Sequence, residues 1–256
     1  MIYDKIPVVF LSTLASEKND STNKIIAEYI LAHQNEIHGI SIKELAAACH
    51  VGTGSISRFV RDIGLNDFSE LKMLLADTFY RFDQANEEKD LRQDQIVHIS
   101  RAIEQALSSV DMLKVQKLAK DIHDYEHVYA CGMLKAQNAA VDLQVDMRML
   151  GKHVSTNVAY ADQIDHILHA DKKDLIIIFS FTGSYFDYQS FRAKERHLLL
   201  PKIWMICGTQ KELPWFVNDA IRFASDGSQR SHPFQLEAVE SLIVQEYARL
   251  FPGKDL

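Results

Sequence analysis

Residues 41–72 read SIKELAAACHVGTGSISRFVRDIGLNDFSELK, and this stretch decides the fold of the N-terminal half. Ser41 followed three residues later by Glu44 forms a capping box, which predicts the start of a helix. Gly52 lies in a short break of the helical pattern, and a second helix is predicted from about Thr53. The stretch therefore predicts two short helices joined by a tight turn.

The second helix has one apolar and one polar face. Its apolar residues recur at helical spacing at Ile56, Phe59, Val60 and Ile63, and Gly64 is a residue type that often follows a helix end. Such a pair of helices is typical of a helix-turn-helix, whose second helix enters the DNA major groove. We expect the following side chains to face DNA: Thr53, Ser55, Ser57, Arg58 and Arg61, with Lys43 and Lys72 contacting phosphate.

The charge of the chain is acidic overall but basic at this motif. The whole sequence carries a net charge of -7, whereas residues 41–61 carry Lys43, Arg58 and Arg61 against one acid, Glu44. Phosphate contacts supply most of the affinity for DNA, so one copy of the motif predicts weak non-specific binding. A dimer that presents two recognition helices would offset this. Of the two arginines, either can pair bidentately with guanine.

Length and composition limit the classes of protein to which the chain can belong. The chain has 256 residues, enough for two small domains. The N-terminus lacks the pattern of a secretory signal, and no apolar run approaches the ~20 residues of a membrane span. Three widely spaced cysteines, Cys49, Cys131 and Cys207, favour buried thiols in a reducing compartment. We therefore expect a cytoplasmic protein without membrane partner, metal site or cofactor.

Helical patterns continue on both sides of the motif. A helix is predicted near Pro7–Ala15, another after the Ser21 cap, and a further one after Asp67, so residues 1–82 form an all-helical domain. Residues 83–95 are almost free of apolar side chains and predict a solvated linker. One amphipathic helix is predicted over 96–119. Residues 83–119 thus connect the first domain to residues 120–256.

The second half, residues 120–256, alternates between strand and helix patterns. Strands are predicted in the segments HVYACG, HVSTNV, DLIIIFS, KIWMICG and AIRFAS, with helices between them. This alternation predicts an α/β domain with a doubly wound, parallel five-stranded sheet. If its strand order is the flavodoxin-like 2-1-3-4-5, a ligand crevice lies between the ends of the first and third strands.

Three hydroxyls follow the third strand at Ser180, Thr182 and Ser184, around Gly183 and before a predicted helix. Free N–H groups at a helix start, with added hydroxyl donors, suit a phosphate, and Lys135 could add a positive charge. The alternative is that these hydroxyls only cap the next helix. Acid–base candidates for an enzyme lack any motif that would fix a pair; they are Asp187, His197, His232 and Glu237.

Together, the two halves resemble the RpiR-type bacterial transcriptional regulators, which join an N-terminal helix-turn-helix to a sugar-isomerase-like (SIS) domain. The resemblance is most specific over residues 55–65 and 67–72, and residues 180–185 resemble the family's Ser-x-Ser-Gly-x-Thr phosphate loop. It implies a homodimeric or homotetrameric regulator of carbohydrate metabolism that binds a double-stranded DNA operator and a phosphorylated sugar effector. The implied ligand site comprises Gly132, Lys135, Ser180, Thr182, Gly183, Ser184 and Tyr185.

The sequence departs from the family pattern at four positions. Gly52 replaces a capping serine, and Tyr185 replaces a threonine. In the first-strand loop, where the family tends to have Gly-x-Gly-x-Ser, Ala130 stands at a glycine position and Leu134 at the serine position. Two alternatives to a phosphosugar-controlled regulator therefore stay open. One is a regulator whose second domain is a ligand-free dimerisation scaffold, and the other is a phosphosugar isomerase.

Overall fold

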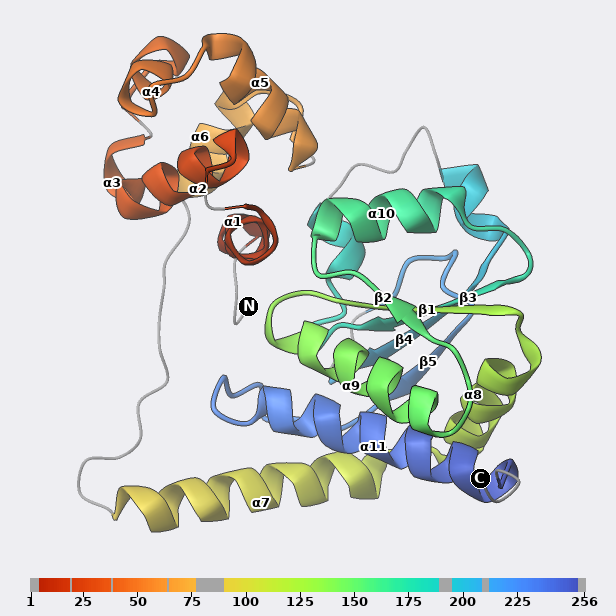
Figure 1. The fold of residues 1–256 in the computed structure, drawn as a ribbon. Helices are drawn as coiled ribbons and strands as arrows, with labels where there is room; N and C mark the ends of the chain where they lie inside the picture. Colours follow the sequence, from red (N-terminus) through yellow and green to blue (C-terminus); the bar gives the residue numbers. More distant parts are fainter. Residues whose placement is uncertain are drawn as a thin grey trace.

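The computed structural model describes residues 5–18, 20–37, 39–63, 65–76, 90–188, 195–208 and 212–252. A helical domain formed by α1 to α6 lies beside an α/β domain formed by α7 to α11 and five strands (Figure 1). Within the described residues, no helix is long and apolar enough to cross a lipid bilayer.

The helical domain contains the expected motif. Its elements are α1 (Lys5–Ser16), α2 (Thr22–Ala32), α3 (Gln34–Ile37), α4 (Ile42–Ala48), α5 (Thr53–Asp62) and α6 (Phe68–Ala76). The capping box at α4 is complete, because the Ser41 N–H donates to Glu44 Oε2 at 2.7 Å and the Glu44 N–H donates to Ser41 Oγ at 3.3 Å. Gly52 caps α5 without a side-chain hydrogen bond. Gly64, expected to end α5, lies outside the described residues.

One apolar core holds these helices together. Ile56, Phe59 and Val60, from the predicted inner face of α5, are fully buried in it. Phe10 of α1 stacks on Phe59 with ring centroids 5.5 Å apart. The first helix thus packs directly on the predicted recognition helix α5.

The connecting region differs from the expected single helix over 96–119. α7 (Leu91–Ser109) ends before Val110, and α8 (Met112–Asp124) begins after it. Asp111 causes the break, since its carboxylate accepts a hydrogen bond from the Leu113 N–H at 2.9 Å and caps α8. Residues 91–95, expected in the linker, already belong to α7, whereas 83–89 lie outside the described residues.

The sheet has the predicted order. Its strands are β1 (His127–Gly132), β2 (Ser155–Thr156), β3 (Asp174–Phe179), β4 (Lys202–Cys207) and β5 (Asp219–Arg222). All neighbours pair in parallel in the order β2-β1-β3-β4-β5. The doubly wound α/β prediction and its flavodoxin-like order are confirmed. By the rule for such sheets, the candidate ligand site, here called the switch crevice, is the region between the carboxyl ends of β1 and β3.

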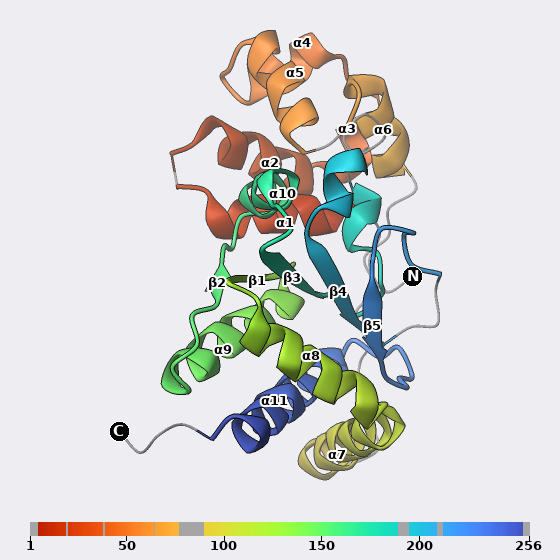
Figure 2. The same ribbon diagram turned by 90° about the vertical axis from the view of Figure 1, so that its right-hand side faces the viewer.

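Helices cover both faces of this sheet. α9 (Lys135–Met149), α11 (His232–Leu250), α7 and α8 lie on one face, and α10 (Tyr160–His169) lies on the other (Figures 1 and 2). Alternate strand residues enter the two cores, as Ile177 and Ile176 of β3 do. The free cysteines Cys49, Cys131 and Cys207 are all buried, as expected.

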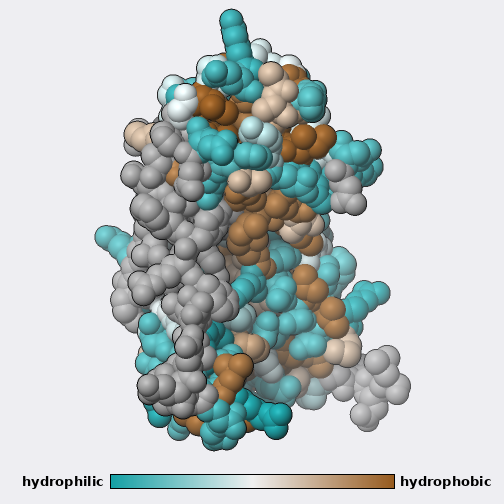
Figure 3. All heavy atoms as spheres, turned by 90° about the vertical axis from the view of Figure 1, so that its left-hand side faces the viewer, coloured by the Kyte–Doolittle hydropathy of each residue, from teal (hydrophilic) through white to brown (hydrophobic). Residues whose placement is uncertain are grey.

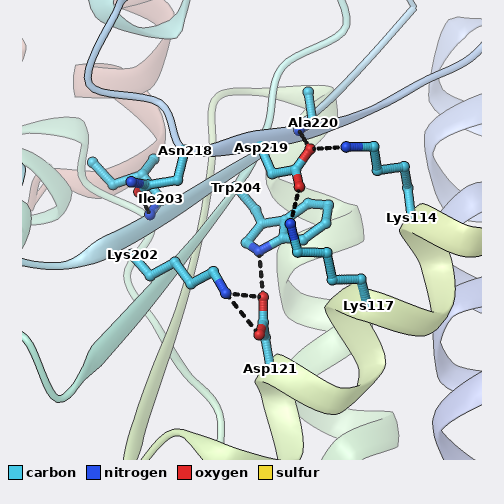
Figure 4. Close-up of polar contacts among 9 residues, drawn as sticks. All are labelled: Lys114, Lys117, Asp121, Lys202, Ile203, Trp204, Asn218, Asp219 and Ala220. Carbon is cyan, nitrogen blue, oxygen red and sulfur yellow. Dashed lines mark hydrogen bonds and ion pairs between the residues drawn. The ribbon is translucent and has the colours of Figure 1, made fainter.

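Two half-buried carboxylates fasten α8 to the strands β4 and β5 (Figure 4). Asp121 accepts hydrogen bonds from Lys202 Nζ at 2.8 Å and from Trp204 Nε1 at 2.7 Å. Asp219 accepts from Lys114 Nζ and Lys117 Nζ, each at 2.6 Å. Burial would raise the pKa of Asp219, but the hydrogen bonds from the two lysines outweigh it and hold that pKa below its usual value.

Candidate functional site

The outer face of α5 presents the predicted DNA-facing side chains. Thr53, Arg58 and Arg61 are exposed, whereas Ser55 and Ser57 are half-buried. The Ser57 hydroxyl donates to the Thr53 carbonyl at 3.1 Å, and Arg61 Nε donates to the Ser57 carbonyl at 3.2 Å. Arg58 has no hydrogen-bond or ion-pair partner among the described residues, so its guanidinium is available to a ligand.

The two predicted phosphate-contacting lysines differ in their surroundings. Lys43 on α4 is exposed. Lys72 on α6 is half-buried, donates to the Ile40 carbonyl at 3.4 Å and lies 5.9 Å from the centre of the Phe68 ring. Lys72 is therefore partly engaged within the domain, and Lys43 is the more accessible cation.

The switch crevice brings most of the predicted ligand residues together. Gly132 at the end of β1 is the register partner of Phe179 at the end of β3, so the loop after Phe179 lies next to Gly132. In that loop Ser180, Gly183 and Ser184 are buried, and Thr182 is half-buried. Gly183 has a positive φ of 67°, and its N–H donates to the Ser180 carbonyl at 2.8 Å.

The helix expected after this loop is not formed as predicted. The described segment is a single 3-10 turn, η1 (Tyr185–Tyr188), and residues 189–194 lie outside the described residues. One 3-10 turn does not align several peptide dipoles. The predicted helix start is therefore wrong for the described segment, and the loop hydroxyls and backbone remain as candidate phosphate donors.

The side chain of Gln163 on α10 forms hydrogen bonds with the backbone at the end of β1. Its Oε1 accepts from the Gly132 N–H at 3.2 Å, and its Nε2 donates to the Gly132 carbonyl at 2.8 Å. Nε2 also lies 2.8 Å from Gln137 Oε1 and 2.7 Å from the Asn157 carbonyl. A fully buried glutamine side chain thus satisfies the backbone that a ligand would meet in this crevice.

Tyr185 completes the same network. Its hydroxyl donates to Gln163 Oε1 at 2.7 Å, and its own carbonyl accepts from the Tyr160 hydroxyl at 3.0 Å. The two tyrosine rings meet edge to face at 5.4 Å. Burial, followed by the proximity of Cys131, raises the pKa of Tyr185 well above its usual value, so the hydroxyl acts as a neutral donor.

Lys135 lies at the rim of the crevice, at the start of α9. It is exposed, and its Nζ reaches the Gln229 carbonyl at 3.5 Å. Burial, together with the charge of Lys135, lowers the pKa of His232 to about 4, so this imidazole is neutral near pH 7. Leu134, beside Lys135, has a positive φ of 53°, a strained conformation for leucine.

Sequence reasoning missed Gln163, Gln137 and Tyr160. A signal for Gln163 exists, because it lies on the apolar face of α10 with Ile164 and Ile167. A polar residue on a buried face needs hydrogen-bond partners. Nothing in the sequence identifies those partners.

Comparisons with known proteins find relatives of this chain. Residues 10–81 match the family model described as "Helix-turn-helix domain, rpiR family". An uncharacterized HTH-type transcriptional regulator of Thermotoga maritima is 23% identical over 240 residues, covering 88% of this chain and 82% of that protein. Another, from Caldanaerobacter subterraneus, is 32% identical over 100 residues, or 37% of this chain and 36% of that protein.

Solved structures share the fold. The Vibrio vulnificus NanR protein complexed with ManNAc-6P superposes with a TM-score of 0.53 at 14% identity, over 96% of this chain and 92% of that one. The sugar isomerase domain of an RpiR transcription factor from Sphaerobacter thermophilus gives a TM-score of 0.53 at 19% identity, over 64% of this chain and 93% of that one. The first of these likenesses covers nearly the whole chain, and the second is a likeness to a sugar isomerase domain.

Proposed function

The chain joins an rpiR-type helix-turn-helix domain to an α/β domain of the sugar-isomerase (SIS) fold, and from this premise we propose a sequence-specific DNA-binding regulator of carbohydrate metabolism. The observation that carries this proposal is the outer face of α5. Arg58 and Arg61 project there from a helix whose opposite face is locked into the domain core. Catalysis of sugar isomerisation would give no role to such a helix.

In this proposal α5 reads base edges and the flanking lysines position the domain. Arg58 is the first choice for guanine, because its guanidinium is unengaged among the described residues, and Arg61 is the second. Thr53, Ser55 and Ser57 add polar contacts, whereas Lys43 and Lys72 contact phosphate. The small local charge favours a homodimer or homotetramer that places two α5 helices on one operator.

The test is operator binding by a double variant. Operator fragments are selected from genomic DNA with the wild-type protein and then measured by fluorescence anisotropy. Arg58→Ala with Arg61→Ala should cost about 1–3 kcal/mol per arginine, and base preference should relax. The matched control is Arg92→Ala with Arg101→Ala, which removes two exposed arginines of α7. Equal affinity and an equal footprint for the two double variants would contradict the assignment of α5 as the recognition helix.

The effector site that we propose is the switch crevice, with a phosphorylated sugar as ligand. The hydroxyls of Ser180, Thr182 and Ser184 are the candidate donors there. The N–H groups of Gly132 and Gly183 already donate to Gln163 Oε1 and to the Ser180 carbonyl, so a ligand would have to replace those partners. Lys135 adds a positive charge at the rim, and Tyr185 closes the inner wall. The solved NanR structure in complex with ManNAc-6P supports this class of ligand. The ligand controls DNA binding only if it binds one arrangement of the protein more tightly than the other.

A ligand-free scaffold is the second candidate, and the hydrogen bonds between Gln163 and Gly132 favour it. A thermal-shift screen with phosphorylated sugars separates the two candidates. A ligand that binds only the folded protein, at a concentration of about 100 times its Kd, should stabilise it by about 2.7 kcal/mol. No shift across aldose, ketose and amino-sugar phosphates would support the scaffold, whereas robust turnover of any of them would favour an isomerase.

A further inference from the structure

We propose that α10 is the element that couples the switch crevice to the DNA-binding domain, and that the Gln163 carboxamide is an internal competitor of the effector. The inference deepens the proposed function and rests on it for the existence of an effector. It starts from the position of α10, which contacts the crevice through one side and the helical domain through its first turn.

On the crevice side, Gln163 already bonds both the N–H and the carbonyl of Gly132. A phosphate or hydroxyl oxygen that accepts a hydrogen bond from the Gly132 N–H uses that same donor. The ligand and the carboxamide cannot use this donor together. Binding at Gly132 therefore displaces Gln163 and breaks its bonds to Tyr185 and Gln137 as well.

A buried glutamine cannot be left without partners at low cost. A buried polar group without hydrogen bonds carries its full desolvation free energy, with nothing to offset it. The displaced carboxamide must therefore move toward solvent. Gln163 follows Tyr160 by three residues on α10, and Tyr160 is tied to the same network through Tyr185. The displacement is therefore expected to shift the N-terminal half of α10 rather than one side chain.

On the other side, α1 packs against α10 and against η1. A cavity of about 310 Å³ lies at this contact, lined by α1, by the C-terminal end of α5 and by residues 159–162. On the face of the molecule that Figure 3 shows, apolar side chains gather at mid-height. Polar side chains of α1, including Ser12, Thr13 and Ser16, line most of the cavity on the α1 side. Interfaces between domains of one chain that are small and partly polar commonly allow the domains to move relative to each other.

From α1 the path to the recognition helix is direct. Phe10 of α1 is fully buried and stacks on Phe59 of α5. Met133, next to Gly132 in the crevice loop, packs against the core of the helical domain and against the core on the α10 side of the sheet. The crevice and α5 are thus joined by one layer of packed side chains, and α10 is the part of it that ligand binding would move.

The test removes the internal competitor without any ligand. Gln163→Leu keeps the volume and deletes the carboxamide, whereas Tyr185→Phe deletes only the hydroxyl that donates to it. The matched control is Gln105→Leu, at an exposed glutamine of α7. Full-length proteins are compared by circular dichroism, by hydrogen exchange of α1 and α10, and by anisotropy on the selected operator.

Both crevice variants should raise amide exchange in α10 and in α1 and change operator affinity in the same direction. The expected change lies between about 5- and 150-fold, the usual range of allosteric coupling, and is smaller for Tyr185→Phe. Gln163→Leu should also bind ManNAc-6P, the probe sugar phosphate, more tightly than wild type. If Gln163→Leu fails to fold, Tyr185→Phe carries the test.

Folded variants with control-like exchange in α1 and control-like operator affinity would overturn the coupling. Failure of the proposed function looks different. If no phosphorylated sugar shifts the wild type but the variants still alter α1 and operator affinity, the coupling stands and the effector is of another class. If the wild type binds a phosphorylated sugar but the variants match the control in α1 exchange and operator affinity, the proposed function stands and α10 is not the coupling element. The exchange measurement decides even if no operator is found.

Discussion

Glu240 on α11 lowers the stability of the α/β domain at neutral pH, and replacing it with glutamine should reveal by how much. Its side chain is 2% exposed, and Oε1 has no hydrogen-bond partner. Burial, followed by the nearby charges of Asp146, Asp142 and Glu237, raises its pKa from 4.5 to about 8. The folded protein therefore keeps this carboxyl protonated at pH 7.

The sign of the pH effect follows from proton uptake. Between pH 4.5 and about 8, the folded state holds a proton on Glu240 that the unfolded chain has released. Stability therefore falls as pH rises through this window, by about 1.4 kcal/mol per pH unit. Below pH 4.5 both states are protonated and the effect vanishes. Summed from about pH 4.5 to 7, the cost is about 3 kcal/mol.

Glu240→Gln mimics the protonated acid and cannot ionise. The variant should be more stable than wild type by about 3 kcal/mol at pH 7 and no more stable at pH 4. Urea unfolding is followed through the fluorescence of Trp204, which is fully buried in the same core, at pH 4, 5, 6, 7 and 8. Glu104→Gln, at an exposed position of α7, is the control.

An unchanged or lower stability of Glu240→Gln at pH 7 would refute this reasoning. It would mean that Glu240 is ionised and compensated by a positive group. That outcome would point to a cation supplied by another molecule, such as a second copy of the chain.

Three further predictions concern backbone geometry and charge. Gly132→Ala should destabilise the α/β domain by several kcal/mol, since the new Cβ would collide with the Ala136 carbonyl. The urea midpoint of the transition followed by Trp204 fluorescence should fall accordingly. Gly52→Ser should stabilise the helical domain by a few tenths of a kcal/mol, because the site is open and lacks a capping side chain; a lowered melting temperature would contradict it. Lys43→Ala should reduce the slope of log affinity against log salt by roughly 1 without altering base preference, and an unchanged slope would remove this phosphate contact.

Local chemistry determined the helix-turn-helix and the strands. The capping box of Ser41 and Glu44 depends on atoms three residues apart, and the apolar face of α5 depends on helical spacing alone. The β-branched run of β3 needs only burial on both faces, which any doubly wound sheet provides. These features could be predicted because each is decided within one element.

Competition between local signals explains the missed break in the connecting helix. The apolar periodicity continues from α7 into α8, so the sequence predicts one helix over 96–119. The Asp111 carboxylate instead caps α8, and a cap of this kind outweighs periodicity only when both helices can pack on α11, as they do here. That condition is set by the whole domain.

Tertiary structure alone decided what fills the crevice. Gln163 and Gly132 are 31 residues apart, and Tyr185 comes from a third segment. Hydrogen bonds between such distant groups follow from how the strands order and how α10 lies on the sheet. The same holds for the contact of α1 with α10. The sequence by itself thus specified the DNA-binding motif and the class of the second domain, whereas long-range packing decided how the crevice is closed and what touches it.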